Sequence, residues 1–181
     1  RPGRARDAVV GFLAAAEALP VEARVAAFDN DGTLWCEKPT YVQFDFFEDA
    51  LRRRAEEDPT LRVRPELAAV LHLDMAAIAA LGLERVALAL AGLFAGIEPE
   101  AFTATARDFM RRARHRTLGV PIAATRFQPM LELLDALRHR DFTVYLVSGG
   151  GTEFLRALSM ELYGVPPEAV VGTQIRYELT R

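Results

Sequence analysis

The sequence is short of cysteine and lysine, with Cys36 and Lys38 the single examples of each among its 181 residues. One cysteine excludes an internal disulfide bond and a zinc site built from several cysteines. One lysine leaves a single candidate for any role that requires that side chain. Because no apolar run approaches the roughly 20 residues of a transmembrane helix, we expect no membrane span.

An excess of charge of either sign is also missing. The sequence holds 22 Lys and Arg against 25 Asp and Glu, for a net charge of −3, which argues against a general nucleic-acid-binding protein. Hydrophobic residues make up 51% and charged residues 26%, so neither a disordered nor a fibrous chain is indicated. The length fits one domain, or one core with a sizeable insertion.

The apolar segment near the N-terminus, AVVGFLAAAEALP, is interrupted by Glu17. Its larger apolar residues fall on one face of a helix, which favours an amphipathic helix over a signal peptide. These residues are Val9, Phe12, Leu13, Ala16 and Leu19. We therefore expect a cytoplasmic protein, and export after removal of an upstream signal peptide is the alternative.

The order of predicted elements indicates an α/β fold. Short apolar strands are predicted at residues 24–28 and 142–147, with one or two more within 168–179. Residues 41 to about 116 have the pattern of four helices without a strand, the second ending at Gly82. A helix is expected on either side of the strand at 142–147. This order predicts a parallel sheet with a helical subdomain inserted after the first strand.

Two polar clusters follow predicted strands: DNDGT at residues 29–33 and SGGGT at residues 148–152. Ligands of open parallel sheets bind beyond the carboxyl ends of the strands, where both clusters lie. Carboxylates suit a divalent cation and a nucleophile, whereas a glycine turn at a helix start suits a phosphate dianion. Asn-Asp-Gly alone is also good turn chemistry, but the two clusters together favour a phosphoryl-transfer site with magnesium.

The stretch AAFDNDGTLW resembles the first signature of the haloacid dehalogenase-like hydrolase superfamily. VYLVSGGGTEF resembles its second signature, especially the form found in phosphoserine phosphatases. This resemblance implies a Rossmann-like parallel-sheet core formed by residues 1–36 and 124–181. It also implies an all-helical cap subdomain inserted at residues 37–123.

The resemblance assigns catalytic roles to the first cluster. Asp29 is expected to attack phosphorus and form an aspartyl-phosphate. Asp31 is expected to protonate the leaving alkoxide and then to take a proton from the hydrolytic water. The Asp29 carboxylate and the Asp31 backbone carbonyl are expected to bind Mg²⁺, the implied cofactor.

The same resemblance implies a phosphate-binding set. Ser148 and the Gly149 amide are expected to hold the transferring phosphoryl oxygens, with Gly150 beside them. Thr33 is assigned to this set through its support of the loop that carries the two aspartates.

Asp31 also discriminates between branches of the superfamily. Members that displace halide from carbon carry tyrosine at this position, and ion pumps carry threonine, so Asp31 favours a phosphatase. We expect a Mg²⁺-dependent hydrolase of a small phosphorylated metabolite. A phosphotransferase of the same superfamily remains open, as does a non-catalytic phosphate- or metabolite-binding protein.

Two pieces of the superfamily's site are not visible in the sequence: a downstream lysine and an acidic motif that completes the magnesium shell. We expect both to lie beyond Arg181, so that the core is C-terminally incomplete. A divergent protein that has lost them is the alternative. Arg176 or Arg181 replacing the lysine is less favoured than an ordinary strand role.

Three further residues are candidates for substrate contact. Trp35 and Lys38 follow the acidic loop closely in sequence, and Arg116 ends a basic run at 111–116 that could hold anions or form a solvated helix end. Phosphoserine phosphatases place a glutamate shortly after the first motif. Here Glu37 lies near that position but Lys38 occupies it, so phosphoserine is not a favoured substrate. The oligomeric state is left open.

Overall fold

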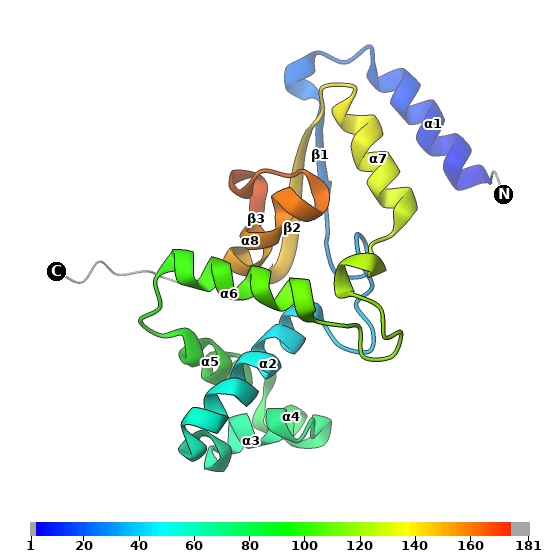
Figure 1. The fold of residues 1–181 in the computed structure, drawn as a ribbon. Coiled ribbons are helices and arrows are strands. Elements are labelled where there is room, and N and C mark those ends of the chain that lie inside the picture. The colour runs from blue at the N-terminus through cyan, green and yellow to red at the C-terminus, as the bar shows by residue number, and fades with distance from the viewer. Residues whose placement is uncertain (1–2, 175–181) are drawn as a thin grey trace.

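A three-stranded parallel sheet forms the centre of the computed structural model, which describes residues 3–174 (Figure 1). The strands β1 (Val25–Phe28), β2 (Thr143–Gly151) and β3 (Val170–Thr173) lie in the order β1-β2-β3. Phe28 of β1 is in register with Leu146 of β2, which is in register with Val170 of β3. The predicted α/β fold class is therefore confirmed, while Arg176 and Arg181 lie outside the described residues.

Three helices accompany the strands: α1 (Arg4–Ala16), α7 (Gln128–Arg138) and α8 (Thr152–Tyr163). The helix α7 leads into β2, and α8 connects β2 to β3, as expected for parallel strands. Gly164 ends α8 in the left-handed conformation, with φ of 64°. The chain makes further single 3₁₀ turns at Val21–Ala23, Pro59–Val63, Gly92–Phe94, Ile122–Thr125 and Pro167–Ala169.

The α-helices between β1 and α7 are α2 (Val42–Glu57), α3 (Pro65–Leu71), α4 (Met75–Leu81), α5 (Leu83–Ala91) and α6 (Pro99–Arg112). One helix predicted to end at Gly82 is divided into α3 and α4. The break occurs because Leu73 adopts a left-handed conformation and the Asp74 carboxylate accepts a hydrogen bond from the Ala77 amide, which starts a new helix. The predicted division at residues 36/37 and 123/124 stays a prediction.

An aromatic cluster joins these helices to the sheet. The ring of Phe46, on α2, is fully buried and lies 5.0 Å from the ring of Phe154 on α8. Phe102 and Phe109 of α6 pack edge-on against Phe46, each at 5.6 Å, and Phe94 stacks on it at 5.4 Å. Because α8 starts at the end of β2, this cluster fixes the first turn of α2 beside the carboxyl end of the sheet.

Within residues 3–174, no single helix is long and apolar enough to cross a membrane. The stretches Met75–Leu81 and Leu83–Phe94 reach that length and composition only when they are taken together, across a bend of 97°.

Replacing Phe46 by alanine is expected to lower the free energy of unfolding by about 3–5 kcal/mol, because the side chain is fully buried among five aromatic rings. Urea denaturation of the purified variant measures this loss. Val63→Ala is the control, since Val63 is 80% exposed and its truncation should stay within about 0.5 kcal/mol of zero. Equal stabilities for the Phe46 variant and the parent would contradict the central position of the cluster.

Candidate active site

The acidic loop begins where β1 ends, with Asp29 directly after Phe28. The Asn30 carbonyl accepts hydrogen bonds from the amides of Thr33 (3.2 Å) and Leu34 (2.8 Å), so the chain folds back tightly. Gly32 has φ of 73°, and a Cβ there would lie 3.1 Å from the Glu37 carboxyl carbon. The backbone conformation therefore favours glycine at this position, and a larger residue would also displace the Glu37 side chain.

The glycine-rich segment forms the end of β2. The sequence predicted a strand at 142–147 and then a turn, but β2 continues through Gly151 and α8 starts at Thr152. Its register against β3 is irregular between Val147 and Gly151. The Gly150 amide donates to the Ser148 hydroxyl oxygen at 3.1 Å. Since that oxygen already accepts this bond, the hydroxyl proton is free to point into the neighbouring cavity.

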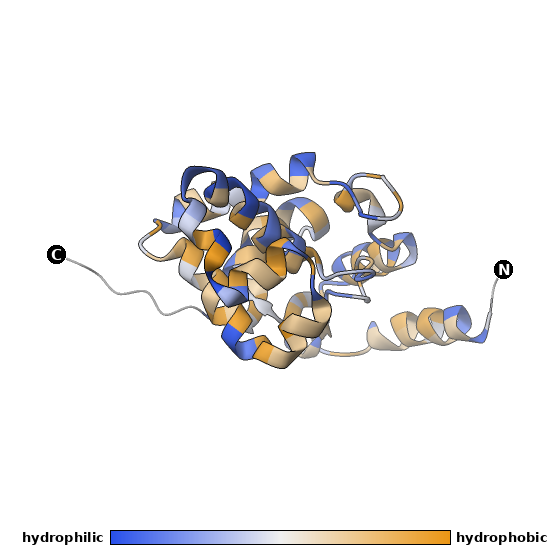
Figure 2. Cartoon of the chain, turned by 90° about the horizontal axis from the view of Figure 1, so that it is seen from below, coloured by the Kyte–Doolittle hydropathy of each residue, from blue (hydrophilic) through white to orange (hydrophobic). Residues whose placement is uncertain are grey.

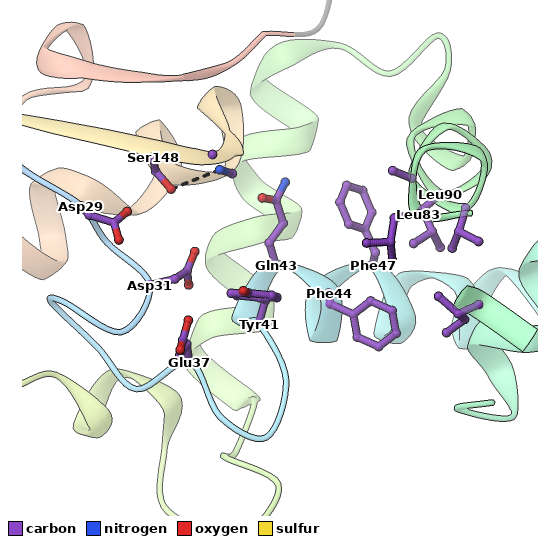
Figure 3. Close-up of a pocket in the computed structure, with 15 residues that line it drawn as sticks. Asp29, Asp31, Glu37, Tyr41, Gln43, Phe44, Phe47, Leu83, Leu90 and Ser148 are labelled. Atoms are coloured by element: carbon purple, nitrogen blue, oxygen red, sulfur yellow. Dashed lines mark hydrogen bonds between the residues drawn. The ribbon is translucent and has the colours of Figure 1, made fainter. Parts of the chain in front are cut away.

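The two segments share one cavity of about 630 Å³ (Figure 3). Asp29, Asp31, Glu37 and Ser148 lie at one end of it, together with the backbone of Gly149 and Gly150. Tyr41 and Gln43 occupy the middle. The remaining lining, called the apolar wall below, consists of Phe44, Phe47, Ile78, Leu83, Val86, Ala87 and Leu90. The structure thus brings both sequence clusters to a single polar end.

The environment of Asp31 favours its protonated form. Burial of the carboxyl group raises the pKa of Asp31, and the neighbouring carboxylates of Asp29 and Glu37 raise it further. The indole N–H of Trp35 donates a hydrogen bond to Asp31 Oδ1 at 2.7 Å, and this bond lowers the pKa of Asp31. Since the net direction is upward, Asp31 retains a proton at higher pH than a free aspartic acid does.

Trp35 does not line the cavity, which corrects the expectation of substrate contact. Its side chain is 1% exposed, and its ring packs edge-on against Tyr163 at 6.3 Å. The tight turn of residues 30–35 directs the indole at Asp31 from behind. Trp35 is therefore a positioning residue for the carboxyl group.

Lys38 and Arg116 also lie off the cavity, contrary to expectation. The exposed Lys38 ammonium lies 3.5 Å from Glu37 Oε1 and 6.0 Å from the Tyr41 ring centre. The Arg116 guanidinium donates to Asp45 (2.8 Å) and Glu48 (2.7 Å), both on α2. The positive charges that were expected to hold a substrate anion are therefore paired with carboxylates: Lys38 with Glu37, and Arg116 with Asp45 and Glu48.

The assignment of Thr33 to the phosphate-binding set, through its support of the acidic loop, stays a prediction. Thr33 lies in the turn of the acidic loop, where its amide donates to the Asn30 carbonyl, and it is not part of the cavity lining. The hydrogen bond from the Thr33 amide is part of the turn that carries the two aspartates. Ser148, Gly149 and Gly150 do line the cavity, and their phosphate-binding role stays a prediction.

Gln43 is a site residue that sequence reasoning missed. Its side-chain oxygen accepts a hydrogen bond from the Gly151 amide at 2.8 Å, across 108 positions of sequence. A Cβ on Gly151 would lie only 2.5 Å from the Gln43 Nε2 atom. The run of glycines was the signal for a close approach, but nothing in the sequence identified the approaching partner.

The donor set at the polar end fits a magnesium ion in part. Mg²⁺ is commonly bound in proteins by one or two carboxylates, with water and substrate phosphate oxygens completing its octahedron. The Asp29 carboxylate is a donor of this kind, the Asp31 backbone carbonyl is the second oxygen that the resemblance assigns, and none of the described lining side chains is basic. No group of three or more His, Cys, Asp and Glu in residues 3–174 forms a complete metal site by itself.

Known proteins resemble this chain in one family model and, distantly, in a solved structure. Residues 26–180 match the family model of the haloacid dehalogenase-like hydrolases. No curated protein matches the chain. Among solved structures, a phosphoserine phosphohydrolase-like protein from Francisella tularensis subsp. tularensis SCHU S4 is similar, with 14% identity and a TM-score of 0.44. The alignment covers 86% of this chain and 60% of the Francisella chain. The chain belongs to the haloacid dehalogenase-like hydrolase family.

The Trp35→Phe variant is expected to raise the pKa of Asp31 above its value in the parent protein, because it keeps a buried ring but loses the N–H that stabilises the carboxylate. Carbon NMR titration of the aspartate carboxyl groups in metal-free protein measures this change. Tyr163→Phe is the control, as it alters the ring against Trp35 without removing a donor to Asp31. An unchanged or lower pKa in the Trp35 variant would contradict the assigned hydrogen bond.

Proposed function

We propose that the protein is a magnesium-dependent phosphomonoester hydrolase that acts through an aspartyl-phosphate on a small phosphorylated metabolite. The observation that carries this proposal is the shared cavity, into which Asp29, Asp31 and Ser148 all open. Membership of a hydrolase family supports the reaction class. The Asp29 and Ser148 segments lie at the carboxyl ends of adjacent parallel strands, where ligands of such sheets bind.

In the first step, a carboxylate oxygen of Asp29 attacks phosphorus while the bond from phosphorus to the ester oxygen breaks. Asp31 gives its proton to the departing alkoxide, which leaves as an alcohol. In the second step, Asp31 takes a proton from water as the water oxygen attacks phosphorus. The Asp29 carboxylate is released with inorganic phosphate, and Asp31 is again protonated.

The raised pKa of Asp31 suits this double role. A general acid must hold a proton at the working pH, and burial beside Asp29 and Glu37 extends that range upward. The Trp35 indole holds the carboxyl group in place and limits the upward shift, so that the carboxylate form also remains accessible. The Ser148 hydroxyl is positioned by the Gly150 amide to donate to a phosphoryl oxygen.

When bound, Mg²⁺ would supply positive charge that offsets the phosphoryl oxygens and the Asp29 carboxylate. The Asp29 carboxylate and the Asp31 backbone carbonyl would hold it. The helices from α2 to α6 act in this proposal as a cap. Gln43, at the start of α2, accepts a hydrogen bond from the Gly151 amide and so encloses the polar end of the cavity. This enclosure limits the access of bulk water to that end.

Asp29→Asn is expected to lower kcat by at least about 10³-fold, because the amide is a poor nucleophile toward phosphorus. The measurement is a screen of phosphomonoesters with the full-length protein and Mg²⁺, with phosphate release as the readout. Asp7→Asn is the matched control, since the Asp7 side chain is 70% exposed on α1. Undiminished turnover by the Asp29 variant would reject the proposed nucleophile.

A further inference from the structure

The cavity extends well beyond the space around Asp29 and Ser148. Its volume of about 630 Å³ lies in the range of pockets that enclose whole small organic molecules. Figure 3 shows the carboxylates at one end and Phe44, Phe47, Leu83 and Leu90 at the other. A substrate that fills this cavity therefore has a second part, which contacts the apolar wall.

The apolar wall is continuous because helical spacing directs its residues to the same side. Phe44 and Phe47 are three residues apart on α2, and Leu83, Val86 and Leu90 are spaced by three and four residues on α5. Val86 and Leu90 are each 3% exposed, so they have a fixed packing. Along α2, Phe47 lies about 6 Å beyond Gln43, at a rise of 1.5 Å per residue.

The charges around the cavity exclude a second anionic group on the substrate. None of the described lining side chains is Lys, Arg or His, and three carboxylates stand at the polar end. Of the candidate cations in the described residues, Lys38 is exposed and lies beside the Glu37 carboxylate, which it offsets, and Arg116 is bonded to Asp45 and Glu48. A carboxylate or second phosphate on the leaving group would lose its hydration without gaining a counter-charge.

We propose that the leaving alcohol is neutral and apolar, so that the protein hydrolyses phosphate monoesters of hydrophobic alcohols. This inference rests on the proposed phosphatase function and specifies its substrate class. The phosphoryl group occupies the end formed by Asp29, Asp31 and Ser148, and the hydrocarbon part lies along the apolar wall. Burial of that part stabilises the complex through the hydrophobic effect.

The test is a series of n-alkyl phosphates from methyl to octyl, with phosphoserine and phosphocholine as polar esters of comparable size. With the full-length protein and Mg²⁺, kcat/KM is expected to rise by about two- to fourfold per added methylene until the wall is covered. Hexyl phosphate should exceed phosphoserine by at least about tenfold. A kcat/KM that is independent of chain length, or highest for a polar ester, would overturn the inference.

Variants of the wall give a matched comparison. Phe44→Ser and Leu83→Ser should each lower the ratio of kcat/KM for hexyl phosphate to that for methyl phosphate, by about tenfold and threefold respectively. Leu83 is 73% exposed, so its replacement does not disturb the core. Leu88→Ser is the control, because Leu88 is also on α5 and 68% exposed but does not line the cavity. An equal change in the ratio for Leu88→Ser would contradict the assignment.

A binding measurement separates this inference from the proposed function. Calorimetry with non-hydrolysable n-alkylphosphonates reports whether affinity rises with chain length, without any need for turnover. Turnover of methyl phosphate with flat affinity along the series would leave the phosphatase in place and overturn the apolar specificity. Absence of turnover for every ester would overturn the proposed function, and the phosphonate series would still decide what the wall binds.

Discussion

The parallel pairing of β1 with β2 is the constraint on which the site depends. Phe28 is in register with Leu146, so Asp29 leaves β1 beside the last residues of β2, which include Ser148. Asp29 therefore meets Ser148, although 118 intervening positions separate them in sequence. An antiparallel arrangement of the same two strands would place the acidic loop and the glycine-rich segment at opposite ends of the sheet.

Placing Asp29, Asp31 and Glu37 together creates a local excess of negative charge, which adds to the effect of burial in raising the pKa of Asp31. Two changes would reduce the repulsion among these carboxylates: a proton on Asp31, or a cation beside Asp29. The first suits a general acid and the second suits a phosphoryl group, which brings further negative charge. In the proposed phosphatase, the electrostatic cost of these carboxylates in the free protein favours the binding of a metal ion.

Sequence alone predicted the strands, the acidic loop and the glycine cluster, because each leaves a local pattern of apolar runs, aspartates or glycines. It failed where a contact depends on packing. Trp35 follows the loop closely, but the turn points its indole at Asp31 instead of the cavity. Arg116, predicted to contact the substrate, forms hydrogen bonds to Asp45 and Glu48 instead. Gln43, on α2, accepts a hydrogen bond from Gly151, which is far from it in sequence. Such partners depend on tertiary structure, which periodicity does not encode.

The helix α2 shows how one element serves both stability and specificity. Its period of 3.6 residues turns Phe46 into the aromatic cluster with Phe154, while Gln43 and Phe44 face the cavity. Phe47 belongs to both, since it lines the cavity and its ring lies 5.5 Å from that of Phe46. The core contact fixes the rotation of α2 about its axis, and that rotation sets which of its side chains line the cavity. The Phe46–Phe154 contact also anchors α2 to α8, which follows the glycine-rich end of β2. The apolar wall and the polar end of the cavity therefore keep a defined distance from each other.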